Sequence, residues 1–208
     1  MNITVPIYKD GKFNGNGFIY KNYLIAPAHV IRFSESNDFK FVFEDSIYYL
    51  TLFDVCYREY EDSNIDEIRK DLIILKTTFM NQLDYNFHDV EKKDAYIKGY
   101  KLLKEDSKEL FQVESKVNVS NLEGYQYNSN NIPIKQHNVF EFKSNDEIIE
   151  GMSGSPIYYG KKLYGILLSG LYSSNAMITY HFTGLKASYI HKILQTIENQ
   201  CNWLKYLR

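Results

Sequence analysis

Three short stretches of the sequence hold side chains that could together perform nucleophilic catalysis. Ser153 stands between two glycines in GMSGSP, His29 follows an apolar run in YLIAPAHVI, and Asp71 precedes an apolar run in KDLIILK. A serine hydroxyl becomes an effective nucleophile when an imidazole accepts its proton and a carboxylate orients that imidazole. The chain therefore contains the three residue types that this chemistry needs.

The turn around the serine has a composition that suits anion binding. Acyl transfer passes through a tetrahedral intermediate whose oxyanion needs backbone N–H donors. Glycine allows backbone conformations that other residues avoid, so we expect this turn to bring the N–H groups of Gly151 and Ser153 beside the Ser153 hydroxyl. The small residues Gly154 and Ser155 would let the turn approach a neighbouring barrel closely.

The elements that would hold these residues are predicted to be mainly β-strands. Aromatic residues suit the pleated surface of a sheet, and the chain has 19 Tyr and 13 Phe. Short apolar or alternating runs recur with turn signals between them, for example at residues 21–22 and 44–45. Apolar residues within 190–204 instead repeat at helical spacing, which predicts an amphipathic helix. The pattern predicts an all-β fold, as barrels or a sandwich, with one C-terminal helix.

Composition and charge argue against several classes of protein. The formal net charge is −2 over 208 residues and the lysines are scattered, so neither a nucleic acid nor a membrane is an expected partner. No run is apolar enough to span a bilayer, and the first residues lack the features of a signal peptide. Cys56 and Cys201 lack metal-ligand spacing and are interpreted as two buried thiols in a reducing compartment. The sequence therefore predicts a cytoplasmic protein with no metal and no cofactor.

The order of the three stretches resembles that of the chymotrypsin-like (trypsin-fold) serine proteases. The matching pieces are GNGFIYKNYLIAPAHVI, DLIILK and GMSGSPIYYGKKLYGILLSG, and FTGLKASYIHKIL is similar to the closing strand and helix of that family. The resemblance implies two six-stranded antiparallel β-barrels with a C-terminal α-helix. The first barrel would comprise residues 1–80 and the second residues 96–208, with a linker at residues 81–95.

The same resemblance implies a role for each site residue. His29 would be the general base, Asp71 the carboxylate that orients it, and Ser153 the nucleophile. The backbone N–H groups of Gly151 and Ser153 would form the oxyanion hole. The strand edge from Leu168 to Gly170 would pair with the backbone of the substrate.

Two features of the sequence leave alternatives or depart from the family. Asp62 and Asp66 lie in the same acidic segment as Asp71 and compete with it for the role of orienting carboxylate. Secreted animal members have an aspartate before the nucleophile that binds a freed N-terminus, whereas this chain has Met152. That difference, and the absence of the usual disulfides, predicts activity without N-terminal trimming and a closer resemblance to bacterial and viral members.

Two residues compete for the base of the pocket that would select the substrate side chain. By register, Glu147 would lie there and favour a basic residue before the scissile bond, although SNDEIIE also reads as a solvated acidic loop. His181, near the closing strand, would instead favour Glu or Gln. The sequence leaves the choice open, with Glu147 slightly preferred.

These inferences together predict a serine endopeptidase that acts on a polypeptide through an acyl-enzyme. An unrestricted protease would harm its own cell, so we expect a narrow substrate range or a regulatory protein partner. The alternatives are a catalytically silent protease fold that binds peptides by strand addition, and an effector domain of a defence, signalling or viral polyprotein system.

Overall fold

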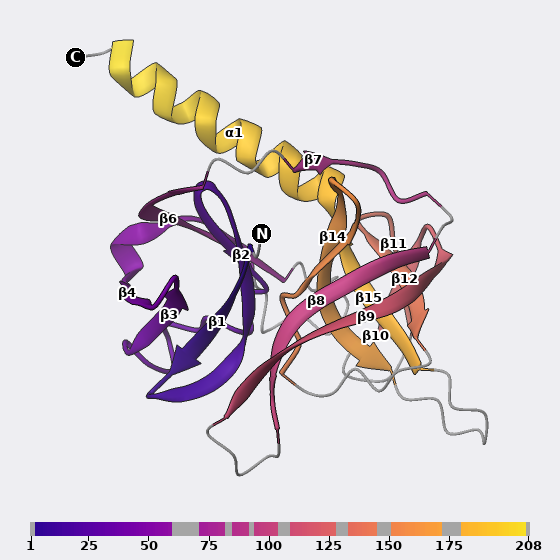
Figure 1. Cartoon of the computed structure of the whole chain (residues 1–208). Coiled ribbons are helices and arrows are strands. Elements are labelled where there is room, and N and C mark those ends of the chain that lie inside the picture. The colour runs from indigo at the N-terminus through magenta and orange to yellow at the C-terminus, as the bar shows by residue number, and fades with distance from the viewer. Residues whose placement is uncertain are drawn as a thin grey trace.

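The structure is a computed structural model that describes residues 3–59, 71–81, 85–91, 94–103, 109–127, 133–144, 151–171 and 180–206. Two curved β-sheets lie side by side, and one helix lies across them at the C-terminal end of the chain (Figure 1). The elements are β1 (Thr4–Lys9), β2 (Lys12–Ala26), β3 (Phe39–Phe43), β4 (Ser46–Leu50), the 3-10 helix η1 (Leu52–Asp54), β5 (Val55–Glu59), β6 (Leu72–Asn81), β7 (Asn86–Phe87), β8 (Asp94–Leu102), β9 (Leu110–Asn121), β10 (Gly124–Tyr127), β11 (Pro133–Gln136), β12 (Val139–Ser144), β13 (Pro156–Tyr159), β14 (Lys162–Leu171), β15 (Tyr180–Lys186) and α1 (Ala187–Tyr206). The predicted all-β fold with one terminal helix is confirmed.

The N-terminal sheet is an antiparallel half-barrel with the strand order β4-β3-β1-β2-β6-β5. The turn that joins β3 to β4 has positive φ at both central residues, 46° at Glu44 and 61° at Asp45. This is the type I′ pattern, whose twist matches that of the flanking strands. The edge strands β4 and β5 are joined through η1, and no backbone pairing links them within the described residues.

Strand β2 folds back on itself at Lys21, where φ is 52°. A Cβ added at Gly17 would lie 3.1 Å from the carbonyl oxygen of Ile25. Eight residues of straight strand would span roughly 26 Å, so the two halves of β2 must lie side by side. The first half pairs with β1 and the second with β6, as expected for a strand–turn–strand unit that leads to His29.

The C-terminal sheet closes into a barrel. Its strands follow the order β13-β8-β9-β12-β15-β14, and a further pairing between β13 and β14 closes the circle. Strand β7 adds to β14 in the parallel direction. The segment that the sequence analysis assigned to a linker, residues 81–95, thus contains β7 and the first residues of β8.

The buried apolar side chains form three clusters. One lies in the first sheet and a second in the closed barrel. The third joins both sheets to α1, whose residues Ile190, Leu194 and Ile197 recur at helical spacing and are all buried. Burial of each such side chain contributes about 1.5–3 kcal/mol, so the helix binds the two halves of the molecule together. No helix in the described part of the chain is long and apolar enough to cross a membrane.

Candidate active site

Strand pairing brings His29 and Asp71 together. Ala26 at the end of β2 pairs with Ile73 near the start of β6, so residues just after β2 and just before β6 lie at the same edge of the sheet. His29 occupies a turn in which Val30 N–H donates to the Pro27 carbonyl at 3.1 Å. The pairing of β2 with β6 thus brings together two residues that are 42 positions apart in the sequence.

The Asp71 carboxylate accepts two hydrogen bonds from the same histidine. The backbone N–H of His29 donates to Asp71 Oδ1 at 2.8 Å, and His29 Nδ1 bonds to Asp71 Oδ2. An ionised carboxylate can only accept, so Nδ1 carries a hydrogen, and in a neutral ring Nε2 is then the acceptor. The side chain of Asp71 is 13% exposed and that of His29 is 30% exposed. The carboxylate therefore fixes both the orientation and the tautomer of a ring that solvent and substrate can reach. The rival carboxylates Asp62 and Asp66 lie outside the described residues.

Ser153 lies in a tight turn that is hydrogen-bonded to strand β14. Gly151 and Gly154, on either side of it, have φ values of 97° and 87°, a region that favours glycine. Gly154 N–H donates to the Leu167 carbonyl at 2.7 Å. The Ser153 hydroxyl donates to the carbonyl of Leu168 at 3.2 Å. The nucleophile candidate is therefore in contact with the strand predicted to bind the substrate backbone.

Two backbone donors at this turn are available for a ligand. Within the described residues, the N–H groups of Gly151 and Ser153 donate to no protein acceptor. The neighbouring amides of Gly154 and Ser155 are instead used inside the protein, on the carbonyls of Leu167 and Met152. The free N–H groups are the two that the sequence analysis assigned to an oxyanion hole.

The segment Leu168–Gly170 has one paired and one open edge. On one side it follows β15, with Ser169 opposite Thr183 and Gly170 opposite Phe182. On the other side, β13 pairs with β14 only as far as Ile166. Among the described residues, the backbone edge beyond Leu167 is thus open to an added strand.

Of the two residues predicted to select the substrate, His181 has a described backbone position. Glu147 lies outside the described residues. His181 belongs to β15, and its backbone lies opposite Lys143 of β12 and Leu171 of β14.

Asn16 is a site residue that the sequence analysis missed. It is 0% exposed, and its side chain bonds to the backbone of Tyr100 and to the carbonyl of Gly151. Its backbone N–H donates to the carbonyl of Ser153 at 2.8 Å. The available signal was an amide side chain between two glycines in GNGF, which reads equally well as turn chemistry.

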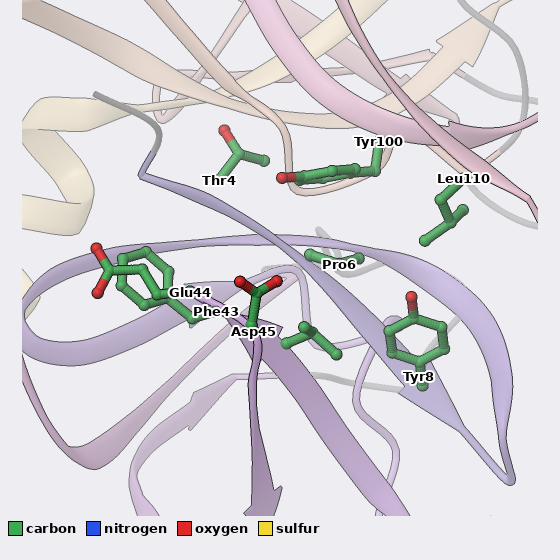
Figure 2. A pocket seen from close by; sticks show the side chains of 9 residues that line it. Thr4, Pro6, Tyr8, Phe43, Glu44, Asp45, Tyr100 and Leu110 are labelled. Atoms are coloured by element: carbon green, nitrogen blue, oxygen red, sulfur yellow. The ribbon is translucent and has the colours of Figure 1, made fainter.

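A pocket of about 370 Å³ opens between the sheets, away from these residues (Figure 2). It is lined by Thr4, Pro6, Tyr8, Val42, Phe43, Glu44, Asp45, Tyr100 and Leu110. Burial, and then the neighbouring phenol of Tyr100, raise the pKa of Tyr8. None of His29, Asp71 and Ser153 lines the pocket, so its volume has no direct bearing on the chemistry above.

The described residues hold no group of three or more His, Cys, Asp or Glu side chains arranged to bind a metal ion. The candidate site thus consists of an imidazole held by Asp71, a hydroxyl in a tight turn that donates to Leu168, and two backbone N–H groups with no protein acceptor among the described residues.

Comparison with solved structures identifies the architecture. Neuropsin, a serine protease expressed in the limbic system of mouse brain, matches with a TM-score of 0.67 and 12% identity over 94% of each chain. The chain has the trypsin fold. Kallikrein-related peptidase 10 matches with a TM-score of 0.62 and 14% identity, over 95% of this chain and 96% of the other.

A bacterial protein shares the trypsin fold as well. Rv3671c from M. tuberculosis, in an inactive form, matches with a TM-score of 0.60 and 18% identity, over 95% of this chain and 87% of the other. By sequence, no family model and no curated protein matches the chain. Animal and bacterial proteins thus match at similarly low identity, and these likenesses establish the fold alone.

Proposed function

We propose that the protein is a serine endopeptidase that cleaves peptide bonds through Ser153, His29 and Asp71. The observation that carries the proposal is the double hydrogen bond of Asp71 to His29, through the backbone N–H and the ring. A solvated surface aspartate would not be expected to make two hydrogen bonds to one histidine, whereas the largely buried Asp71 does. A Cβ at Gly154 would lie 2.9 Å from Cδ of Pro27, so the turns that carry Ser153 and His29 are neighbours. Within a trypsin fold, a fixed imidazole near a serine turn supports general-base catalysis.

In the proposed acylation step, Ser153 Oγ attacks the carbonyl carbon of the scissile peptide while its proton moves to His29 Nε2. The hydroxyl must first exchange its hydrogen bond with the Leu168 carbonyl for one with that nitrogen. The electron pair of the carbonyl moves to its oxygen, which accepts hydrogen bonds from the N–H groups of Gly151 and Ser153.

Collapse of the tetrahedral intermediate breaks the C–N bond. The departing amine takes the proton from His29, and the acyl group stays on Ser153 as an ester. Water then attacks the ester while His29 accepts its proton, and a second collapse releases the acid and restores the hydroxyl. Asp71 stays ionised and stabilises the imidazolium that forms in both halves of the cycle.

Fluorophosphonate labelling of the purified protein tests the proposal. We expect the wild type to be labelled on Ser153 and to hydrolyse members of a peptide library. Ser153→Ala should lose labelling and about 10⁴- to 10⁶-fold in turnover, with an unchanged circular dichroism spectrum because only one hydroxyl is removed. A folded wild type that neither labels nor hydrolyses would refute the proposal and favour a peptide-binding module.

The substrate preference is proposed to depend on Glu147 or His181. If Glu147 lies at the base of the specificity pocket, the library should show preference for Lys or Arg, and Glu147→Gln should remove it. If His181 lies there, the preference should be for Glu or Gln, and His181→Ala should remove it. A profile that neither variant changes would exclude both residues.

We further propose a polypeptide substrate in the cytoplasm and a regulatory protein partner. The proposed location rests on the two isolated cysteines described above. Fractionation of cells that produce a tagged Ser153→Ala protein would test the location, and identification of the proteins recovered with it would test the substrate and the partner. Recovery outside the cytoplasm would refute the location.

A further inference from the structure

We propose that Asn16 is a positioning residue whose side-chain amide holds the nucleophile turn in the conformation that an oxyanion hole requires. The inference rests on the proposed hydrolase function and concerns how the same site is assembled. Asn16 lies in β2 and acts through the turn rather than on the substrate.

The amide of Asn16 is fixed first to the second barrel. Its Oδ1 accepts the backbone N–H of Tyr100 at 2.8 Å, and its Nδ2 donates to the Tyr100 carbonyl at 3.0 Å. The side chain thus pairs with β8 at two points, as a peptide group does in an antiparallel ladder. A fully buried amide held at two points has a single orientation.

The same amide then reaches the nucleophile turn. Nδ2 also donates to the carbonyl of Gly151 at 2.8 Å, so both of its hydrogens are used. The backbone N–H of Asn16 donates to the carbonyl of Ser153 at 2.8 Å. One residue therefore holds two carbonyls of the turn, one on each side of Met152.

The Ser153 N–H belongs to the peptide between Met152 and Ser153, and three bonds restrain that peptide. Ser155 N–H donates to the carbonyl of the peptide itself, that of Met152, at 3.0 Å, while the two bonds from Asn16 hold the carbonyls on either side. Gly151, with φ of 97°, has several accessible backbone conformations and supplies no restraint of its own. The side-chain bond from Asn16 to Gly151 is the further restraint, and its loss would let the turn shift together with the Ser153 N–H. A displacement of about 1 Å in a catalytic group costs about 10²-fold in rate.

A matched control separates this role from simple cross-linking of the barrels. Thr4 of β1 is 2% exposed, and its hydroxyl donates to the Lys98 carbonyl of β8 at 3.0 Å. This bond joins the same two sheets, two residues from Tyr100, without involving the nucleophile turn. Thr4→Val removes it with little change in volume.

The experiment compares Asn16→Ala and Asn16→Asp with Thr4→Val in the full chain. Both Asn16 variants lose the donor to Gly151, and both keep the backbone N–H that binds Ser153. The measurements are kcat and KM on one peptide substrate, and Tm by circular dichroism. We expect kcat to fall about 10- to 100-fold in the Asn16 variants with KM within about twofold. Thr4→Val should lower Tm and leave kcat within about twofold.

Several results would overturn the positioning role. Asn16 variants with wild-type kcat, or with a raised KM and unchanged kcat, would contradict it. So would an equal loss of kcat in Thr4→Val, or a failure of both Asn16 variants to fold when Thr4→Val folds. A wild type without Ser153-dependent hydrolysis would instead refute the proposed function, and the positioning role with it.

Discussion

Replacement of Gly154 by alanine would test how closely the nucleophile turn fits against the first barrel. A Cβ at this position would lie 1.8 Å from the carbonyl oxygen of Asn16 and 2.7 Å from its carbonyl carbon. Both are backbone atoms of β2, which is hydrogen-bonded to β1 and β6. Neither atom can rotate away as the end of a side chain would, so the turn and the strand must separate.

The required separation sets the size of the effect. Cβ contacts below 3.0 Å are essentially never found, so the distance of 1.8 Å must grow by about 1.2 Å. A shift of that size at the nucleophile is expected to lower kcat about 10²-fold. The positive φ of Gly154 adds about 1–2 kcal/mol for any residue with a Cβ, and overpacking adds about 1–3 kcal/mol. Their sum corresponds to a fall in Tm of about 4–20 °C.

Gly160 offers the control for backbone strain without steric conflict. Its φ is 58°, and an added Cβ would meet no atom within 4 Å. Gly160→Ala should therefore lower Tm by only about 2–8 °C and leave kcat unchanged. Thermal unfolding followed by circular dichroism and steady-state kinetics measure both variants. The reasoning fails if Gly154→Ala keeps wild-type kcat and loses no more Tm than Gly160→Ala.

Three further predictions concern other contacts. Asp71→Asn should lower kcat about 10⁴-fold by favouring the wrong histidine tautomer, and steady-state kinetics near the wild-type rate would rule out this carboxylate. Burial, and then the hydrogen bond to Glu59, raise the pKa of Tyr189 above 10.0. As the pH rises, the unfolded chain therefore loses this proton before the folded protein does, and the free energy of unfolding should fall above about pH 10. Tyr189→Phe should make that fall shallower in denaturant titrations, and an unchanged slope would contradict the assignment. Among the described residues the buried Ser155 hydroxyl has no hydrogen-bond partner, and a Cβ at Gly99 would lie 1.9 Å from it and 3.0 Å from the Ser155 Cβ. Ser155→Ala should therefore reduce the loss of Tm caused by Gly99→Ala, and additive losses in the double variant would refute this coupling.

The pairing of His29 with Asp71 was implied by the resemblance to the trypsin-fold proteases, and the apolar runs that both residues flank are the paired strands β2 and β6. Both strands bury side chains in the core of the first sheet and also in the core between the two sheets. This burial pattern specifies the register of β2 against β6. The terminal helix was predictable from the sequence itself, since the spacing of Ile190, Leu194 and Ile197 has only one regular solution. In these cases local pattern and tertiary burial agree.

The contacts of Asn16 could not be predicted, because they join residues far apart in the chain. Tyr100 is 84 residues away and Gly151 is 135 residues away. No periodicity relates such positions, and an asparagine between glycines is most often part of a turn. Strand β7 escaped prediction for a different reason. It is two residues long and polar in part. It pairs with Lys162 and Leu163 of β14, before the pairing of β14 with β15 begins at Gly165.

Because β2 contacts the nucleophile turn, the site is complete only after the two barrels have docked. Ser153 belongs to one barrel and Asn16 to the other, and the core that joins the barrels includes α1, which follows both of them in the chain. A newly made chain whose second barrel has formed but has not yet docked would hold Ser153 in a turn that lacks both bonds to Asn16. If the proposed hydrolase function holds, such a chain would stay inactive until the barrels dock. Docking would then be the activating step, and it would need no covalent change.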